Sequence, residues 1–248
     1  MNEQNNFGLM SKEYNSARRG YPQEIFHYLK SIIITDKPLT LDIGCGTGIS
    51  TRQLRQYDFE VTGADKDVAM IDTAIEQTDD INYIIATADK LPFESNTFDL
   101  VTAFTSFHWF NDKKSLLEIK RVLKKGGIFF AALKTNREDE NVDFRNGYTT
   151  ILKKYAGEHF DRTQDHLNKE FLIKVGFPEI TEQSFMVDEN YTVEEALTLL
   201  KSLSIYNLIE EDKKPEMLKE MKAFYESHLV NGFVLRSRKI STFFSNKK

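Results

Sequence analysis

The chain has 248 residues, a formal net charge of −5 at pH 7 and a hydrophobic fraction of 40%. Its length suits one large α/β domain with a well-buried core better than two independent domains. The acidic balance gives no overall positive field, and the longest apolar run, near Ile128–Leu133, is far shorter than the roughly 20 residues of a membrane span, so neither nucleic acid nor a membrane is an expected partner.

Strands and helices are predicted to alternate as β-α-β units, which implies a mostly parallel sheet with helices on both faces. The predicted strands span residues 39–43, 60–64, 82–86, 98–103, 127–133, 180–187 and 233–243. The predicted helices span residues 22–34, 47–57, 67–77, 113–123, 142–156, 166–174, 192–202 and 211–228. Residues 1–35 and 190–230 stand outside a minimal core. We expect both to form a helical lid over the carboxyl edge of the sheet, where open α/β sheets bind ligands.

The first predicted strand contains Asp42 and runs into three glycines at alternating positions, Gly44, Gly46 and Gly48. Glycine reaches positive φ cheaply and has no Cβ, so such a loop lets a ligand approach the backbone. The unpaired N–H groups of the helix that follows suit carboxylate or ribose oxygens. A tight turn without a ligand is the alternative. Cys45 is expected to be a small filler in this loop, because no base or second cysteine accompanies it.

The second predicted strand ends at Asp65, where an acidic side chain can accept both hydroxyls of a ribose. A helix N-cap is the alternative role for this residue. A dinucleotide fingerprint has the spacing G-x-G-x-x-G, whereas the third glycine here comes one residue early. The spacing therefore favours a cofactor with a ribose and without a pyrophosphate.

Five segments resemble, in their order and spacing, the class I S-adenosylmethionine-dependent methyltransferases, and among them the small-molecule enzymes with a methyltransferase type 11 domain. These segments are Leu41–Gly48, Val61–Lys66, Ala86–Phe93, Phe98–Ala103 and Val122–Gly127. The flanking stretches Tyr14–Pro22 and His108–Phe110 resemble the trans-aconitate methyltransferase-like branch. The resemblance implies a Rossmann-like sheet of seven strands in the order 3-2-1-4-5-7-6, with the last strand antiparallel and residues 36–135 as the cofactor-binding core of a single domain.

The resemblance also implies S-adenosylmethionine as the cofactor. Asp89, next to Ala88, would accept a hydrogen bond from the adenine amino group, and Asp42 would tie down the glycine loop or the cofactor's ammonium; a turn-stabilising aspartate is the alternative for both. Arg18 resembles the family arginine before Gly-Tyr-Pro and could pair with a carboxylate of the cofactor or substrate. Arg19 replaces the usual proline, so which arginine points inward stays open. The remaining expected cofactor contacts are Tyr14, Cys45, Lys66, Phe104 and Thr105.

His108 and Trp109 follow the fourth predicted strand, at the edge where the transferable methyl group should lie. His108 could act as a base or orient an acceptor carboxylate, and Trp109 could wall the pocket or contact the sulfonium. A packed aromatic cluster is the alternative for both. Tyr21 and Tyr206 are further expected substrate contacts, with Leu203 where relatives often carry tryptophan.

The sequence therefore predicts an enzyme that methylates a small molecule, with a carboxylic acid favoured among acceptors. An NAD-dependent oxidoreductase is disfavoured by the glycine spacing and by the lack of a Tyr-x-x-x-Lys pair, and a non-catalytic nucleoside-binding scaffold is the other alternative. One cysteine cannot form a disulfide within the chain, and Met1–Asn6 do not resemble a leader, so a cytoplasmic location is expected. We expect a monomer or homodimer and no metal ligand set.

Overall fold

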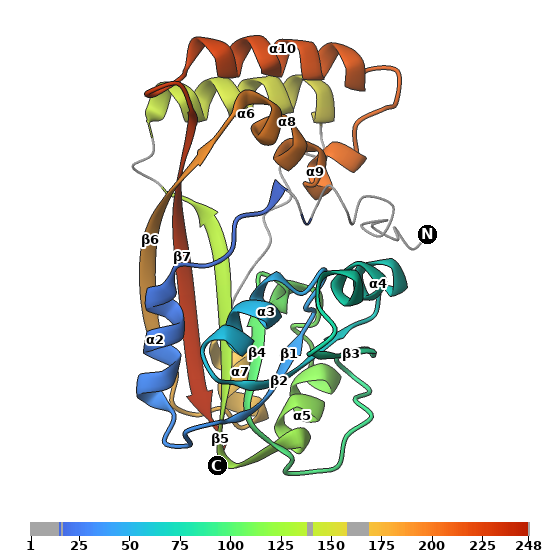
Figure 1. Cartoon of the computed structure of the whole chain (residues 1–248), viewed down its shortest axis with the longest axis vertical. Coiled ribbons are helices and arrows are strands. Elements are labelled where there is room, and N and C mark those ends of the chain that lie inside the picture. The colour runs from blue at the N-terminus through green and yellow to red at the C-terminus, as the bar shows by residue number, and fades with distance from the viewer. Residues whose placement is uncertain (1–14, 16, 138–140, 158–168, 248) are drawn as a thin grey trace. The chain divides into compact units, whose positions relative to one another are not determined.

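The computed structural model describes residues 15, 17–137, 141–157 and 169–247 (Figure 1). These residues form two compact units. The helical unit comprises the described residues of Met1–Arg19, Asn136–Thr163 and Met186–Lys239. The sheet unit comprises those of Gly20–Thr135, Gln164–Phe185 and Ile240–Lys248. That residues 1–35 and 190–230 form a lid stays a prediction.

The seven strands form one sheet in the order β3-β2-β1-β4-β5-β7-β6, which confirms the predicted Rossmann-like topology. The strands are β1 (Leu39–Ile43), β2 (Glu60–Asp65), β3 (Asn82–Ile85), β4 (Phe98–Phe104), β5 (Leu123–Asn136), β6 (Thr181–Tyr191) and β7 (Val234–Asn246). The pairs from β3 to β5 are parallel. Backbone hydrogen bonds join Gly126 to Lys247 and Arg137 to Ser237, so residue numbers fall along β7 as they rise along β5. The last strand is therefore antiparallel, as Figure 1 shows.

Five α-helices and one short 3₁₀-helix belong to the described part of the sheet unit. They are α2 (Gln23–Ile32), α3 (Ile49–Gln56), α4 (Val68–Gln77), η2 (Phe107–Trp109), α5 (Lys113–Val122) and α7 (Lys169–Val175). Apolar residues at helical spacing face the sheet, as Leu116, Ile119 and Val122 do on α5. Helix α3 begins later than predicted because Gly48 is its N-cap, in the left-handed conformation.

The start of β5 differs from the prediction. Residues 123–126 were expected to end a helix and turn, yet α5 stops at Val122 and the strand begins at Leu123. Leu123 pairs with Phe98, and a register shift follows before Leu100 pairs with Ile128. The prediction was wrong because an irregularity of the ladder, invisible in the local sequence pattern, adds these residues to the strand.

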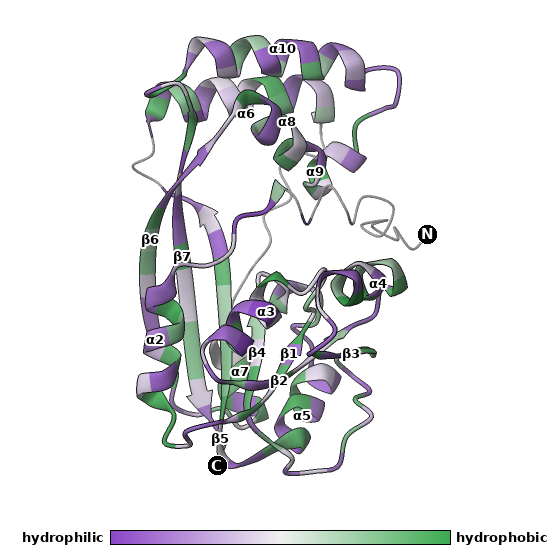
Figure 2. Cartoon of the chain, in the orientation of Figure 1, coloured by the Kyte–Doolittle hydropathy of each residue, from purple (hydrophilic) through white to green (hydrophobic). Residues whose placement is uncertain are grey.

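The helical unit has a hydrophobic core of its own. Its helices are α6 (Val142–Ala156), α8 (Val193–Lys201), α9 (Ser204–Asn207) and α10 (Lys214–Ser227). On α10 the buried residues Met217, Met221 and Tyr225 recur every four positions, and Figure 2 shows polar and apolar residues alternating along this helix. Helices α9 and η2 were not predicted, because four and three residues are too few to produce a periodic pattern. No helix in the described ranges has the length and apolar character needed to cross a membrane.

Candidate functional site

The strand order of the sheet reverses between β1 and β4. From β1 the chain builds outward to β2 and β3, and from β4 it builds the other way to β5. The connections that leave the carboxyl ends of β1 and β4 therefore run in opposite directions along the sheet, and open α/β sheets bind ligands at such a point. The glycine loop follows β1 here, Asp65 ends the neighbouring β2, and the turn with His108 and Trp109 follows β4.

The three glycines of the loop differ in what surrounds them, although all have positive φ. A Cβ on Gly44 would lie 2.5 Å from the Ser106 Cβ, and one on Gly48 would lie 2.4 Å from the Tyr83 hydroxyl oxygen. Packing therefore requires glycine at these two positions. A Cβ on Gly46 would meet no protein atom within 4 Å, so open space adjoins the backbone there. That space is what a ligand close to the loop needs.

Asp65 fastens this loop to the end of β2. Its Oδ2 accepts a hydrogen bond from the Gly46 N–H at 2.9 Å, and its Oδ1 accepts one from the Asp67 N–H at 3.0 Å. Burial raises the pKa of Asp65, and these backbone donors oppose the shift. Each carboxylate oxygen keeps a further lone pair, so the side chain can still accept ribose hydroxyls.

The helix cap that was considered for Asp65 is provided by another residue. Asp67 is the N-cap of α4, and its Oδ1 accepts hydrogen bonds from the N–H groups of Ala69 and Met70. The N-cap alternative for Asp65 is therefore wrong. The two aspartates stand two residues apart and serve different elements.

Asp42 lies beneath the loop and is fully buried. Its Oδ2 accepts hydrogen bonds from the hydroxyls of Ser50 and Thr51 on α3, and its Oδ1 accepts one from Thr102 on β4, each at 2.8 Å. The residue thus anchors the helix that follows the glycine loop. A contact with the cofactor's ammonium stays a prediction. Cys45 is also buried, which raises the pKa of its thiol and keeps it protonated.

We expect Asp42→Asn to change how stability depends on pH. Burial raises the pKa of Asp42 from 3.8 to about 6 in the folded chain. Because the folded state holds this proton more tightly, the residue's contribution to stability is full below the unfolded value and is lost as pH rises through 6. The loss amounts to roughly 3 kcal/mol. Urea unfolding at several pH values should show that the free energy of unfolding of the native chain, relative to that of the variant, falls as pH rises from 3.8 through 6. A difference that does not change with pH would contradict the raised pKa of Asp42.

The turn after β4 contains Thr105, Ser106 and the helix η2. Ser106 Oγ donates to the carbonyl of Ile43 at 2.8 Å, which joins the turn to the glycine loop. The rings of His108 and Trp109 contact each other at an interplanar angle of 43°, with centroids 4.8 Å apart. Trp109 is 47% exposed, whereas the neighbouring Phe107 is buried. Phe107 packs against Phe110, Phe129 and Phe243, whereas His108 is half-buried beside Trp109.

The segment after β3 lies beside Asp65, because the Ala86 N–H donates to the Asp65 carbonyl at 2.9 Å. Ala88 is buried, and Asp89 is exposed in the turn between the bridged residues Thr87 and Lys90. The expected adenine contact of Asp89 stays a prediction, as do the contacts of Lys66 and Phe104.

Of the other expected site residues, Arg18 and Tyr206 belong to the helical unit and Tyr21 to the sheet unit, and Tyr14 lies outside the described residues. Arg18 Nη2 donates to the Ser202 carbonyl at 3.3 Å. Arg19 forms an ion pair with Glu195 at 2.9 Å, and its guanidinium lies 4.9 Å from the ring centroid of Tyr191. Tyr206 is buried, with the Lys214 ammonium 4.9 Å from its ring centroid. The proposed roles of Arg18 and Tyr206 toward a ligand stay predictions.

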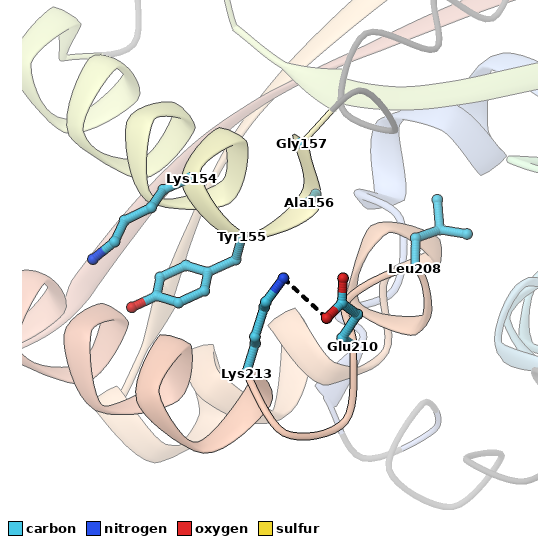
Figure 3. A pocket seen from close by; sticks show the side chains of 7 residues that line it. All are labelled: Lys154, Tyr155, Ala156, Gly157, Leu208, Glu210 and Lys213. Atoms are coloured by element: carbon cyan, nitrogen blue, oxygen red, sulfur yellow. Dashed lines mark ion pairs between the residues drawn. The ribbon is translucent and has the colours of Figure 1, made fainter.

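A hollow of about 340 Å³ also opens within the helical unit (Figure 3). It is lined by Lys154, Tyr155, Ala156, Gly157, Leu208, Glu210 and Lys213. Glu210 and Lys213 form an ion pair across 2.9 Å, and Lys154 pairs with Glu220 at 2.7 Å. No residue of the glycine loop lines this hollow, so we do not assign the chemistry to it.

Three residues that shape the site were missed by sequence reasoning. Tyr83 on β3 fills the space beside Gly48, and Gln53 and Lys134 hold the segment before α2. Each reaches the site from a different element, and no spacing in the sequence links them. The only local signal was the Gly-Tyr-Pro stretch to which two of them bind.

Comparison with known proteins agrees with the geometry. A family profile described as a methyltransferase domain matches residues 41–131. An uncharacterized methyltransferase of Schizosaccharomyces pombe is 28% identical over 211 residues, which cover 84% of this chain and 82% of the relative. A mitochondrial arginine-hydroxylase of Mus musculus is 35% identical over 141 residues, but these cover 50% of this chain and 40% of that protein. Since a related segment occurs in a protein named for other chemistry, the acceptor must be argued from the site.

Among solved structures, phosphoethanolamine N-methyltransferase 2 of Haemonchus contortus has a similar fold, with a TM-score of 0.52 and 20% identity. The match covers 91% of this chain and 52% of that one. That protein was solved with S-adenosylhomocysteine and phosphomonomethylethanolamine. At this identity the likeness shows the fold alone.

Proposed function

We propose that the chain is a class I S-adenosylmethionine-dependent methyltransferase, in keeping with the methyltransferase-domain match at residues 41–131, and that it methylates a small carboxylic acid. The main support for a cofactor site is the open space at Gly46, whose N–H donates to the carboxylate of Asp65. A nucleoside fits this arrangement, because the loop admits its ribose and Asp65 can accept the ribose hydroxyls.

In this proposal the residues at the ends of the first strands hold the cofactor. Asp65 binds the ribose, Asp89 accepts from the adenine amino group, and the backbone at Gly46 contacts the ligand directly. When bound, S-adenosylmethionine supplies a methyl group on a positively charged sulfur.

The turn after β4 supplies the acceptor side. Between Thr105 and Phe110 there is no carboxylate, and the hydroxyls of Thr105 and Ser106 already have partners within the protein, so an anionic acceptor would be met by the His108 imidazole and the Trp109 indole. A carboxylate is already a nucleophile at neutral pH, and the protein then has to orient it and exclude water. The new bond forms between the acceptor oxygen and the methyl carbon as the sulfur–carbon bond breaks, and the electron pair of that bond stays on sulfur. In this proposal His108 orients the acceptor, and Trp109 lines the pocket that holds the acceptor.

His108→Ala should lower turnover while the affinity for S-adenosylhomocysteine stays close to that of the native chain. A residue that touches only the acceptor affects the acceptor-dependent step and leaves cofactor binding intact. Small carboxylic acids, phenols and amines would first be screened by release of S-adenosylhomocysteine, and the variant would be measured on the best acceptor. We expect a rise in the acceptor KM of about tenfold, the cost of roughly 1.4 kcal/mol of binding.

The matched control for this variant is His27→Ala, because His27 is an exposed residue of α2 and contacts Tyr57. Unchanged kinetics in His108→Ala would remove the imidazole from the acceptor site. A clear preference for phenols or amines in the screen would contradict the carboxylic acid while leaving the methyltransferase assignment in place.

A further inference from the structure

The backbone at Thr105 is strained. In the described part of the chain, four non-glycine residues have positive φ, and Asp58, Asn96 and Asn231 are of the types that tolerate it. Thr105, with a φ of 51°, is β-branched, and for such a side chain the left-handed region is a real departure. Strain of this kind persists only where the surrounding structure enforces it, and it gathers at functional sites.

Three hydrogen bonds enforce this conformation. The Thr105 N–H donates to the Ala132 carbonyl at 2.6 Å, and the Lys134 N–H donates to Thr105 Oγ1 at 3.3 Å. The hydroxyls of Thr105 and Tyr21 lie 2.8 Å apart. The first two bonds come from the adjacent strand β5, whereas Tyr21 comes from the segment before α2 and is distant in sequence.

Tyr21 is itself held in place. The side-chain amide of Gln53 on α3 accepts from the Tyr21 N–H and donates to its carbonyl, each at 2.8 Å. The Tyr21 ring packs on Phe104 with centroids 4.7 Å apart, and the Lys134 ammonium lies 4.9 Å from its centroid. The Tyr21 hydroxyl therefore connects the helix that follows the glycine loop to the end of β4.

The turn at Thr105 places groups that face the glycine loop. Ser106 comes next, and its hydroxyl donates to Ile43 at 2.8 Å while its Cβ occupies the space that a side chain on Gly44 would need. Helix η2 then carries His108 and Trp109. A change of φ at Thr105 would move all of these relative to the loop.

We infer that Tyr21 is a positioning residue for this methyltransferase: its hydroxyl holds Thr105 in the left-handed conformation and so fixes the turn that faces the glycine loop. Tyr21 was expected to contact the substrate, whereas its hydroxyl here acts within the protein. The use of the turn in catalysis rests on the proposed function, but the control of the turn by Tyr21 does not.

Tyr21→Phe tests the inference, because it removes one hydroxyl and keeps the ring. Trp109 is the chain's only tryptophan and lies on the turn, so its fluorescence reports the turn directly. In Tyr21→Phe we expect acrylamide to quench Trp109 more strongly in the ligand-free protein. Calorimetry should show S-adenosylhomocysteine binding about 2- to 12-fold more weakly, the range for one neutral hydrogen bond.

Matched variants separate positioning from general damage. Tyr28→Phe removes a hydroxyl from α2, where the ring packs on Phe185 and Phe244, and should change neither readout. Thr105→Ser keeps the hydroxyl and should behave like the native chain. Thr105→Val keeps the β-branching but loses the hydrogen bond to Tyr21. Tyr21→Phe combined with Thr105→Val should therefore bind S-adenosylhomocysteine no more weakly than the more affected single variant.

Two outcomes would overturn the inference. One is unchanged Trp109 quenching and unchanged affinity for S-adenosylhomocysteine in Tyr21→Phe. The other is a double variant whose loss of binding free energy equals the sum of the losses in the two single variants. Quenching is measured without ligand, so this result is independent of the proposed function. A native chain that binds no S-adenosylhomocysteine would instead refute that function.

Discussion

Gly46→Ala is expected to weaken S-adenosylhomocysteine binding by roughly 10- to 200-fold, the range for one methyl or methylene group that a fitted pocket must reject. The added Cβ would meet no protein atom within 4 Å, so the methyl group would occupy space that the ligand needs. Its φ of 54° disfavours alanine, which should lower the stability by about 1–2 kcal/mol and leave the protein folded. Calorimetry gives the affinity, and thermal unfolding gives the stability.

Gly126→Ala is the matched control. Gly126 has a φ of 76°, and a Cβ added there would also meet no atom within 4 Å, but this glycine lies at the start of β5 and away from the loop. The variant should lose similar stability and keep full affinity. Gly44→Ala should instead damage the fold, because its Cβ would lie 2.5 Å from Ser106. Native affinity in Gly46→Ala would show that the open space at this position is not the ligand's.

Asp65→Ala is expected to weaken the same ligand by about 1.5–3 kcal/mol, the range for hydrogen bonds to a charged group. This corresponds to roughly 10- to 150-fold in affinity. The change removes the proposed acceptor for the ribose hydroxyls and also frees the Gly46 N–H, which the carboxylate holds at 2.9 Å. Both losses act on binding, so the affinity should fall much more than the stability.

Asp67→Ala provides the comparison, because the two aspartates are close in sequence and differ in role. Asp67 caps α4 through bonds to Ala69 and Met70. Its loss should lower stability by about 1 kcal/mol and leave the affinity unchanged. If the two variants showed the reverse pattern, with Asp67→Ala defective in binding and Asp65→Ala only in stability, the assignment of Asp65 to the ribose would be wrong.

The sequence predicted the sheet well because the evidence for it is local. Each of the first four strands combines an apolar run with a recognisable turn, and Gly44, Gly46, Gly48 and Asp65 mark where β1 and β2 end. Predictions from the local sequence pattern were wrong where contacts between residues far apart in the chain determine the structure. The early start of β5 at Leu123 depends on pairing with Phe98, which no pattern near residue 123 records.

The candidate site shows the same division. Sequence reasoning found the glycines, yet it could not say that Gly44 and Gly48 are required by Ser106 and Tyr83 whereas Gly46 borders open space. Nor could it exclude a helix cap for Asp65, since a carboxylate at a strand end also fits that role, and only the bonds of Asp67 show which residue caps α4. The strain at Thr105 has no sequence signature, because threonine there looks like an ordinary strand end.

The most direct test of the central claim is a calorimetric titration of the native chain with S-adenosylhomocysteine and, separately, with NAD. A glycine loop without the pyrophosphate spacing and an acidic residue at the end of β2 predict saturable binding of S-adenosylhomocysteine at a single site and no heat with NAD. Tight binding of NAD with no response to S-adenosylhomocysteine would contradict the account.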